Sequence, residues 1–372
     1  MTQNLVDTGS YNVGIGYSAQ SRLIAGSRNI GLGSNALYDI KNGNDNIGIG
    51  HNSLLYNNGS SNICIGSNSY GGGTLGNGNT GSNNIGIGAD SLLNTTSQYN
   101  IAIGSNVLKT STSGASNIGI GYESLIDNTS GNSNIMLGMR SGVLITTGSN
   151  NVAIGKDCLN TLTTQNYNIG IGITTGQGAT ATATTNGNDN ISIGRNAGPD
   201  SLTYLNTVSI GCGAIAATSN TMALGNSSMT VKIAGGVAIT SDARDKTDIS
   251  EISLGLDFIN KLKPVNYRMN FRESYNDFIQ NEDGTTTIVP IENDGSRKRI
   301  RLHNGFIAQD IKQIIDETGN DFAGYKDFSY YGGADSVGLT YDEFIAPMVK
   351  AIQELSAQVK ELKEEVEILK NR

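Results

Sequence analysis

A pentapeptide that recurs about every 17 residues constrains the fold of this chain more than any other feature. It reads Asn, Ile or Val, a small residue, Ile or Leu, then Gly. Such a period is too short for the helical repeats and is typical of a solenoid of short strands, which we predict for residues 1–240. The pentads start at residues 12, 29, 46, 62, 84, 100, 117, 134, 151, 168 and 190, with looser copies at Thr207 and Thr221.

The alternation within each pentad assigns its residues to two faces of a strand. In residues 46–50, Ile47 and Ile49 lie on one face and Asn46 and Gly48 on the other. Repeated along the rod, the isoleucine face becomes a continuous apolar ladder. The middle position is small in every unit except the one with Met136, which indicates that another backbone approaches closely there.

A second motif follows each pentad, with Ser and Leu seven and eight residues after the Asn, as in Ser53 and Leu54. We therefore predict two strand-like pieces in each unit. Two steps of 22 residues indicate longer loops, near residues 71–81 and 176–188. Thirteen rungs spaced by about 4.8 Å would form a rod of roughly 60 Å.

A coil of 17 residues has little core of its own, so association of chains would stabilise it. The pentad resembles the repeats of trimeric autotransporter adhesin heads. That resemblance implies a left-handed parallel β-roll assembled in threes, although the longer period here leaves the handedness open.

Two other interpretations of the glycines are not supported by the residues around them. Gly211, Gly213 and Ala216 resemble part of a dinucleotide fingerprint, but no crossover helix or acidic ribose partner follows them. A calcium-binding roll requires an Asp in every repeat, whereas nine acidic residues are scattered over residues 1–240. Asparagine ladders in the turns explain the pattern better.

The remaining composition excludes several classes of site. Cys64, Cys158 and Cys212 have no paired spacing, and His51 and His303 are too few for a metal cluster, so we expect no metal or cofactor. The net charge of −8 offers no basic face for nucleic acid. No run of eighteen apolar residues and no secretory signal are present, which predicts no membrane insertion and folding in a host cytoplasm.

The composition changes abruptly at Ser241. Residues 1–240 contain 9 acidic and 8 basic residues, whereas the remainder contains 24 and 17. Beyond Ser241 we expect a helix near residues 253–263, a strand at 265–271, a hairpin within 285–302 and a helix at 307–319. This predicts a small α+β domain at residues 241–340.

Residues 341–372 carry apolar side chains in alternating steps of three and four, which predicts a coiled coil. Pro347 should delay the start of its regular helix. The core residues favour two strands and the adhesin resemblance favours three; we expect three, because rod and coil must share one symmetry. The apolar positions are Ile345, Met348, Ile352, Leu355, Val359, Leu362, Val366 and Leu369.

The segments "SDARDKTDISEISLGLDFINKLKPVNYR", "HNGFIAQDI" and "LTYDEFIAPMVKAIQELSAQV" occur in that order over residues 241–372. They resemble the self-cleaving intramolecular chaperone domain behind phage endosialidases, tail fibres and neck appendages. The resemblance implies a domain that assists trimeric folding of the preceding fibre and is then cut away. It places the cut between Thr240 and Ser241, with Ser241 as nucleophile and Lys246 as base.

By the same resemblance, Asp242 and Arg244 occupy supporting positions, and His303 a structural or trimer-forming one. Independently of the family, a serine hydroxyl needs a neighbouring base, and a lysine acts as one only when burial or positive charge lowers its pKa. Arg244 would help in this respect, whereas Asp242 and Asp245 would oppose it.

These features together predict a homotrimeric viral fibre or appendage precursor, with the mature rod in the virion and the chaperone released. Other virion proteins and a host-surface glycan or receptor are candidate partners. Two alternatives stay open. One is an adhesin that binds its receptor through the loops near residues 71–81 and 176–188, and the other is a structural spike whose trimer clamp is never cut.

Overall fold

The chain consists of two compact units, which we call the solenoid unit (Met1–Lys232) and the C-terminal unit (Ile233–Arg372). None of the described helices is long and apolar enough to cross a membrane. The predicted domain limits at residues 240 and 340 stay predictions. The computed structural model describes residues 9–71, 80–176, 187–201, 203–226, 229, 231–234, 241–271, 275–280, 286–327 and 337–371.

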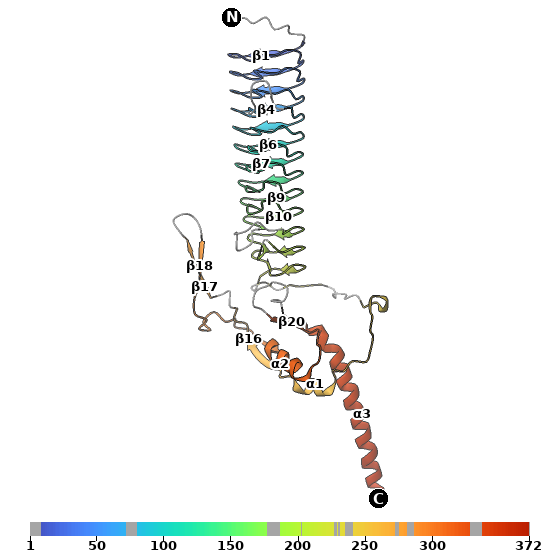
Figure 1. Cartoon of the computed structure of the whole chain (residues 1–372). Coiled ribbons are helices and arrows are strands. Elements are labelled where there is room, and N and C mark those ends of the chain that lie inside the picture. Colours follow the sequence, from blue (N-terminus) through green and yellow to red (C-terminus); the bar gives the residue numbers. More distant parts are fainter. Residues whose placement is uncertain are drawn as a thin grey trace. The chain divides into compact units, whose positions relative to one another are not determined.

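The solenoid unit contains a parallel sheet of thirteen strands, which confirms the predicted β-solenoid. Each pentad contributes one strand, and equivalent residues of successive pentads pair with each other. Figure 1 shows the strands stacked along the solenoid. They are β1 (Val13–Ile15), β2 (Ile30–Leu32), β3 (Ile47–Ile49), β4 (Ile63–Ile65), β5 (Ile85–Ile87), β6 (Ile101–Ile103), β7 (Ile118–Ile120), β8 (Ile135–Leu137), β9 (Val152–Ile154), β10 (Ile169–Ile171), β11 (Ile191–Ile193), β13 (Val208–Ile210) and β15 (Met222–Leu224).

The middle residue of strands β2 to β11 and of β13 is buried inside the coil, and the apolar residues on either side of it are at least partly exposed. In β3, Gly48 is buried while Ile47 and Ile49 are partly exposed. A Cβ on Gly48 would lie 3.2 Å from Leu37 Cγ, 3.3 Å from the Ser53 carbonyl oxygen and 3.5 Å from Leu54 Cδ1. The middle residue is therefore small because leucine side chains, as well as backbone, fill the interior beside it.

The predicted second strand of each unit is wrong for most coils. Leu54 and Leu92 lie in tight turns with φ of 52° and 53°, in the left-handed region. Burying a leucine side chain gains about 2 kcal/mol, which offsets the cost of that backbone conformation. In the described residues, a second strand pair forms at this place only between β12 (Gly198–Pro199) and β14 (Ile215–Ala216).

In one coil the large interior side chain comes from the strand, and the small residue lies in the turn. Met136 is the bulky middle residue of β8, and the position that is leucine in neighbouring coils is Gly142. A Cβ on Gly142 would lie 2.8 Å from Met136 Sδ and 3.0 Å from Ile145 Cδ1. The large side chain thus comes from the strand instead of the turn, and the interior keeps its packing density.

A buried asparagine ladder runs along the inside of the solenoid. The Oδ1 atom of Asn29 accepts a hydrogen bond from the backbone N–H of Asn46 at 2.9 Å, and Asn46 Nδ2 donates to the Gly59 carbonyl at 2.9 Å. The same backbone contact recurs from Asn117 to Asn100 and from Asn134 to Asn117. Each buried amide thereby satisfies polar backbone groups of the coil next to it, which the asparagine pattern predicted.

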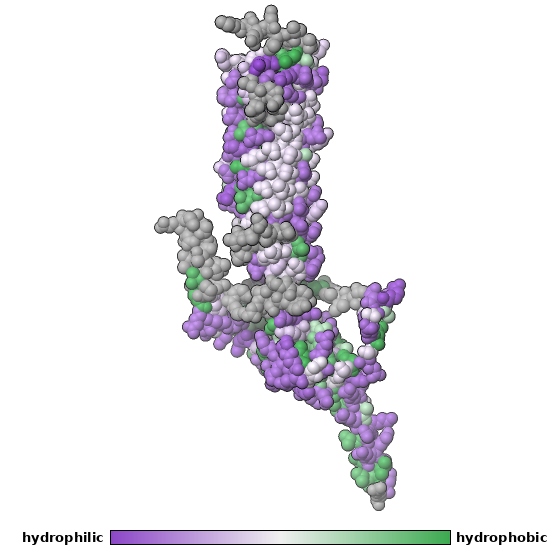
Figure 2. Space-filling view, in the orientation of Figure 1, coloured by the Kyte–Doolittle hydropathy of each residue, from purple (hydrophilic) through white to green (hydrophobic). Residues whose placement is uncertain are grey.

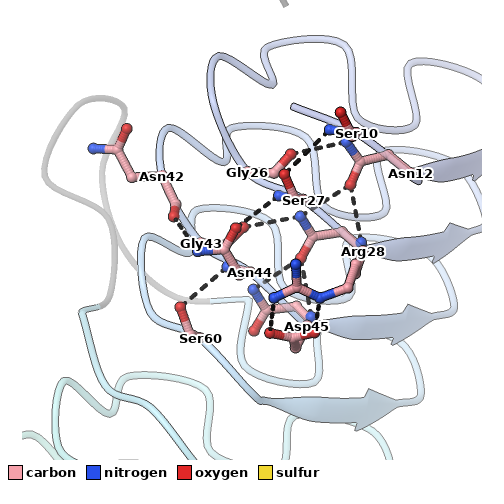
Figure 3. Close-up of polar contacts among 12 residues, drawn as sticks. Ser10, Asn12, Gly26, Ser27, Arg28, Asn42, Gly43, Asn44, Asp45 and Ser60 are labelled. Carbon is pink, nitrogen blue, oxygen red and sulfur yellow. Dashed lines mark hydrogen bonds and ion pairs between the residues drawn. The ribbon is translucent and has the colours of Figure 1, made fainter. Parts of the chain in front are cut away.

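A second polar ladder follows the outer turn, and Figure 3 shows its first rungs. The backbone N–H of Ser10 donates to Ser27 Oγ at 3.1 Å, Ser27 N–H to Asn44 Oδ1 at 2.8 Å, and Asn44 N–H to Ser60 Oγ at 3.0 Å. Serine and asparagine recur in this column because their side-chain oxygens accept from the turn of the preceding coil.

The C-terminal unit is a small α+β fold with an aromatic core. The core side chains are Leu254, Phe258, Ile311, Ile314, Phe322 and Phe344. The elements are α1 (Leu256–Lys261), β16 (Val265–Arg268), β17 (Asn276–Gln280), β18 (Thr286–Pro290), β19 (Leu302–Gly305), α2 (Ala308–Thr318), β20 (Tyr325–Asp327), β21 (Val337–Leu339) and α3 (Ile345–Lys370).

The hairpin predicted within residues 285–302 is wrong. β18 pairs with β17, and β19 pairs with β16, both in antiparallel register. The backbone N–H of Arg299 also donates to the Met269 carbonyl at 2.7 Å. Alternating residues predicted the strands, but alternation carries no information about which strand is the partner.

Helix α3 begins at Ile345, so the predicted delay at Pro347 is wrong. Pro347 lies in the first turn, where the backbone N–H that proline lacks would have no partner within the helix. Its coiled-coil positions face outward: Ile352 and Leu369 are each 66% exposed, and apolar residues follow α3 in Figure 2. The coiled coil itself stays a prediction.

Candidate functional site

Ser241 and Lys246 meet at the start of the described C-terminal unit. Lys246 Nζ lies 2.7 Å from Ser241 Oγ and donates a hydrogen bond to it. Five extended residues would span about 17 Å, so the chain must fold back between them. It does so through the single 3₁₀ turn Ala243–Asp245, where the Lys246 N–H donates to the Ala243 carbonyl at 3.3 Å.

Asp242 stabilises this turn as its N-terminal cap. Its Oδ1 atom accepts the backbone N–H of Arg244 at 2.9 Å, and the Arg244 guanidinium binds the same carboxylate at 2.6 to 3.1 Å. The hydrogen bonds from Arg244 hold the pKa of Asp242 below its ordinary value. We predicted Arg244 as a positive charge acting on Lys246, but its guanidinium is paired with Asp242.

The side chains of this contact are exposed to solvent in the single chain. Ser241 and Lys246 are both exposed, and Asp242 is partly buried. Thr240, which would supply the carbonyl attacked by Ser241, lies outside the described residues. The described segment therefore brings the Ser241 hydroxyl and the Lys246 amine together without shielding them from water.

His303 lies in the sheet of the C-terminal unit. It is in β19 opposite Tyr267 of β16, and the two rings stack with centroids 5.7 Å apart and planes inclined by 21°. The contacts that the structure shows for His303 are within this sheet. A structural role for His303 stays a prediction.

Sequence reasoning missed one long-range contact that holds the unit together. Glu354 Oε2 on α3 accepts the Leu256 N–H at the start of α1 at 2.7 Å, across 98 residues of sequence. No local pattern could have predicted it. The Asp242 cap, in contrast, was detectable, because Asp before a turn commonly accepts the N–H two residues later.

The structure does not describe most of the loops predicted to bind a receptor. Residues 72–79 and 177–186, which form most of the loops assigned to receptor binding, lie outside the described residues. Within the described ranges, no three His, Cys, Asp or Glu side chains gather where they could hold a metal ion.

Comparison with known families matches the segment that begins with Ser241. A family model described as the chaperone of endosialidase matches residues 241–320. This endosialidase-chaperone segment contains Ser241, Lys246, α1 and α2, and ends before α3. A comparison with curated proteins finds no match to the chain. A β-solenoid followed by an endosialidase-chaperone segment fits a tail-fibre-like protein.

Proposed function

We propose that this chain is the precursor of a homotrimeric viral fibre or appendage, and that its C-terminal unit assists trimerisation and is then released by autoproteolysis between Thr240 and Ser241. The observation that carries the proposal is the 2.7 Å contact between Lys246 Nζ and Ser241 Oγ. It occurs at the first residue matched by the endosialidase-chaperone family model.

The chemistry uses these two side chains, the peptide bond before Ser241 and one water molecule, and it requires that assembly favour the neutral form of the Lys246 amine, as burial does. A neutral Lys246 amine takes the hydroxyl proton while Ser241 Oγ bonds to the Thr240 carbonyl carbon. The carbon–nitrogen bond then breaks, the Ser241 nitrogen takes the proton back from Lys246, and an ester joins Thr240 to Ser241 Oγ. Water hydrolyses the ester, which leaves a carboxylate on Thr240 and a free amine on Ser241.

Two exposed apolar surfaces support assembly of several chains. In the solenoid unit the outward isoleucines form an uninterrupted stripe, with Ile154 40% and Ile193 36% exposed. In the C-terminal unit the coiled-coil positions of α3 are exposed along the helix. Long apolar stripes on soluble chains mark interaction surfaces, and burial between chains would also exclude water from the exposed Ser241–Lys246 pair.

The masses of the purified product test this proposal. Under denaturing conditions we expect two polypeptides, residues 1–240 and residues 241–372, the second with Ser241 at its amino terminus. Under native conditions the rod should have the mass of three copies of residues 1–240. A single uncut chain would indicate the permanent clamp instead, and ragged ends at other residues would indicate a contaminating protease.

A further inference from the structure

Two columns of exposed residues border the isoleucine stripe, one at each end of the strands. The leading column is the residue before each pentad Asn, and the trailing column is the residue after each pentad Gly. Members of both columns are exposed: Tyr167 by 58% and Ile173 by 52% on one rung, Tyr11 by 84% and Tyr17 by 80% on another.

On the rung of β11 the two members carry opposite charges, and on the rung of β10 both are large. β11 lies between Asp189 and Arg195, both exposed. Among the described residues neither forms an ion pair within its own chain, and the Arg195 guanidinium donates to Cys212 Sγ of the next coil at 3.6 Å. β10 lies between Tyr167 and Ile173. On none of the thirteen rungs do the two positions carry the same charge. Strand β11 (Ile191–Ile193) separates Asp189 from Arg195, and within one chain the structure shows no ion pair between them.

Rotational symmetry brings these ends together. If three identical sheets surround one axis parallel to the solenoid, their strands run head to tail around it, so each leading column meets the neighbour's trailing column. A fully extended pentad is about 17 Å long, and the centre of a triangle with that side lies about 5 Å from each sheet, half the usual spacing of about 10 Å between packed sheets. Isoleucine side chains fill a space of that size.

We infer that the isoleucine face is the interface between three copies of this chain, aligned rung by rung, with the leading column of each copy in contact with the trailing column of the next. The Asp189 carboxylate of one copy then pairs with the Arg195 guanidinium of its neighbour, and Tyr167 packs on the neighbour's Ile173. This inference rests on the proposed trimer and adds its interface, direction and register.

A single substitution tests the register, because Cys212 is already a trailing residue. It is exposed, whereas Cys64 and Cys158 are buried, and burial raises the pKa of these two thiols to about 12 and about 11. The leading residue on the rung of Cys212 is Asn206, also exposed. In the full-length chain, Asn206→Cys should form disulfides with the neighbour's Cys212 when oxidised glutathione accepts the two electrons.

The expected product is specific in size. Every chain then has one thiol at each end of strand β13. Three disulfides therefore join the three chains, and a non-reducing denaturing gel should show a covalent trimer. Asp189→Cys and Asn220→Cys place the new thiol one rung away on either side, and each should cross-link at least tenfold less. A Cys64→Ala, Cys158→Ala background leaves the result unchanged.

Three outcomes would overturn the inference. Cross-linking by Asp189→Cys or Asn220→Cys in place of Asn206→Cys would show a shifted register. A covalent dimer would show two sheets face to face. If no variant cross-links although the native mass is that of three copies, the strand ends lie outside the interface, while the proposed trimer itself would stand.

Discussion

Ser241→Ala is expected to yield a full-length, folded chain in which the bond between Thr240 and Ser241 stays intact. The substitution removes the proposed nucleophilic oxygen and leaves the turn Ala243–Asp245 and its Asp242 cap in place. The rate of cleavage should fall on the order of 10³-fold or more, as when other serine nucleophiles are removed. Mass measurement of the denatured chain over several days would detect this, and its native mass should still be that of three copies.

Substitutions of Lys246 distinguish two roles for this residue, that of a base and that of a hydrogen-bond donor only. Lys246→Ala should slow cleavage nearly as much as Ser241→Ala, and Lys246→Arg should not restore it, because a guanidinium does not give up its proton. Ser250→Ala, at an exposed serine of the same segment, is the matched control and should cleave at the rate of the unmodified chain. Two fragments persisting with Ser241→Ala would show that the nucleophile is assigned wrongly.

Deleting residues 241–372 from the gene should lower the yield of soluble trimeric rod at least tenfold. Each of the thirteen strands pairs only with strands of neighbouring coils. The chain between two strands must therefore close into a loop before their pairing can stabilise the fold, which makes folding slow. A partly folded solenoid also exposes unpaired strand edges, which favour aggregation. Centrifugation followed by native mass measurement of the soluble fraction would quantify the effect.

Timing provides the control for this deletion. When a specific protease site is inserted before residue 241 in Ser241→Ala, cutting there after folding should leave the rod soluble and trimeric, because the proposed role of the C-terminal unit is kinetic. If the truncated gene gave a soluble trimer as readily as the full one, the chaperone role would be excluded.

The solenoid could be predicted from the sequence because each strand repeats one pattern in register. The turns could not. The recurring Ser-Leu motif predicts strands at Leu54 and Leu92, but both adopt positive φ, which leucine rarely does, and the stabilisation from burying them depends on the interior of the whole coil. The exchange of Met136 with Gly142 likewise becomes intelligible only when neighbouring coils enclose a shared interior.

In the C-terminal unit, resemblance to a family indicated Ser241 and Lys246, and the structure places their side chains in contact. It did not indicate that Arg244 is held by Asp242, because a charge pattern does not show which neighbour a charge binds. The contact from Glu354 to the start of α1 spans 98 residues and depends on tertiary packing alone.

Mixing two forms of the protein tests most directly whether the chain cuts itself. Isotope-labelled Ser241→Ala trimer is incubated with a tenfold excess of the unmodified protein, and the masses of the labelled chains are followed. If every Ser241 attacks the carbonyl of its own Thr240, as we propose, the labelled chain should remain whole while the unlabelled chain yields residues 1–240 and 241–372. Labelled fragments ending at Thr240 would contradict this account and show that the cut is made from outside the chain.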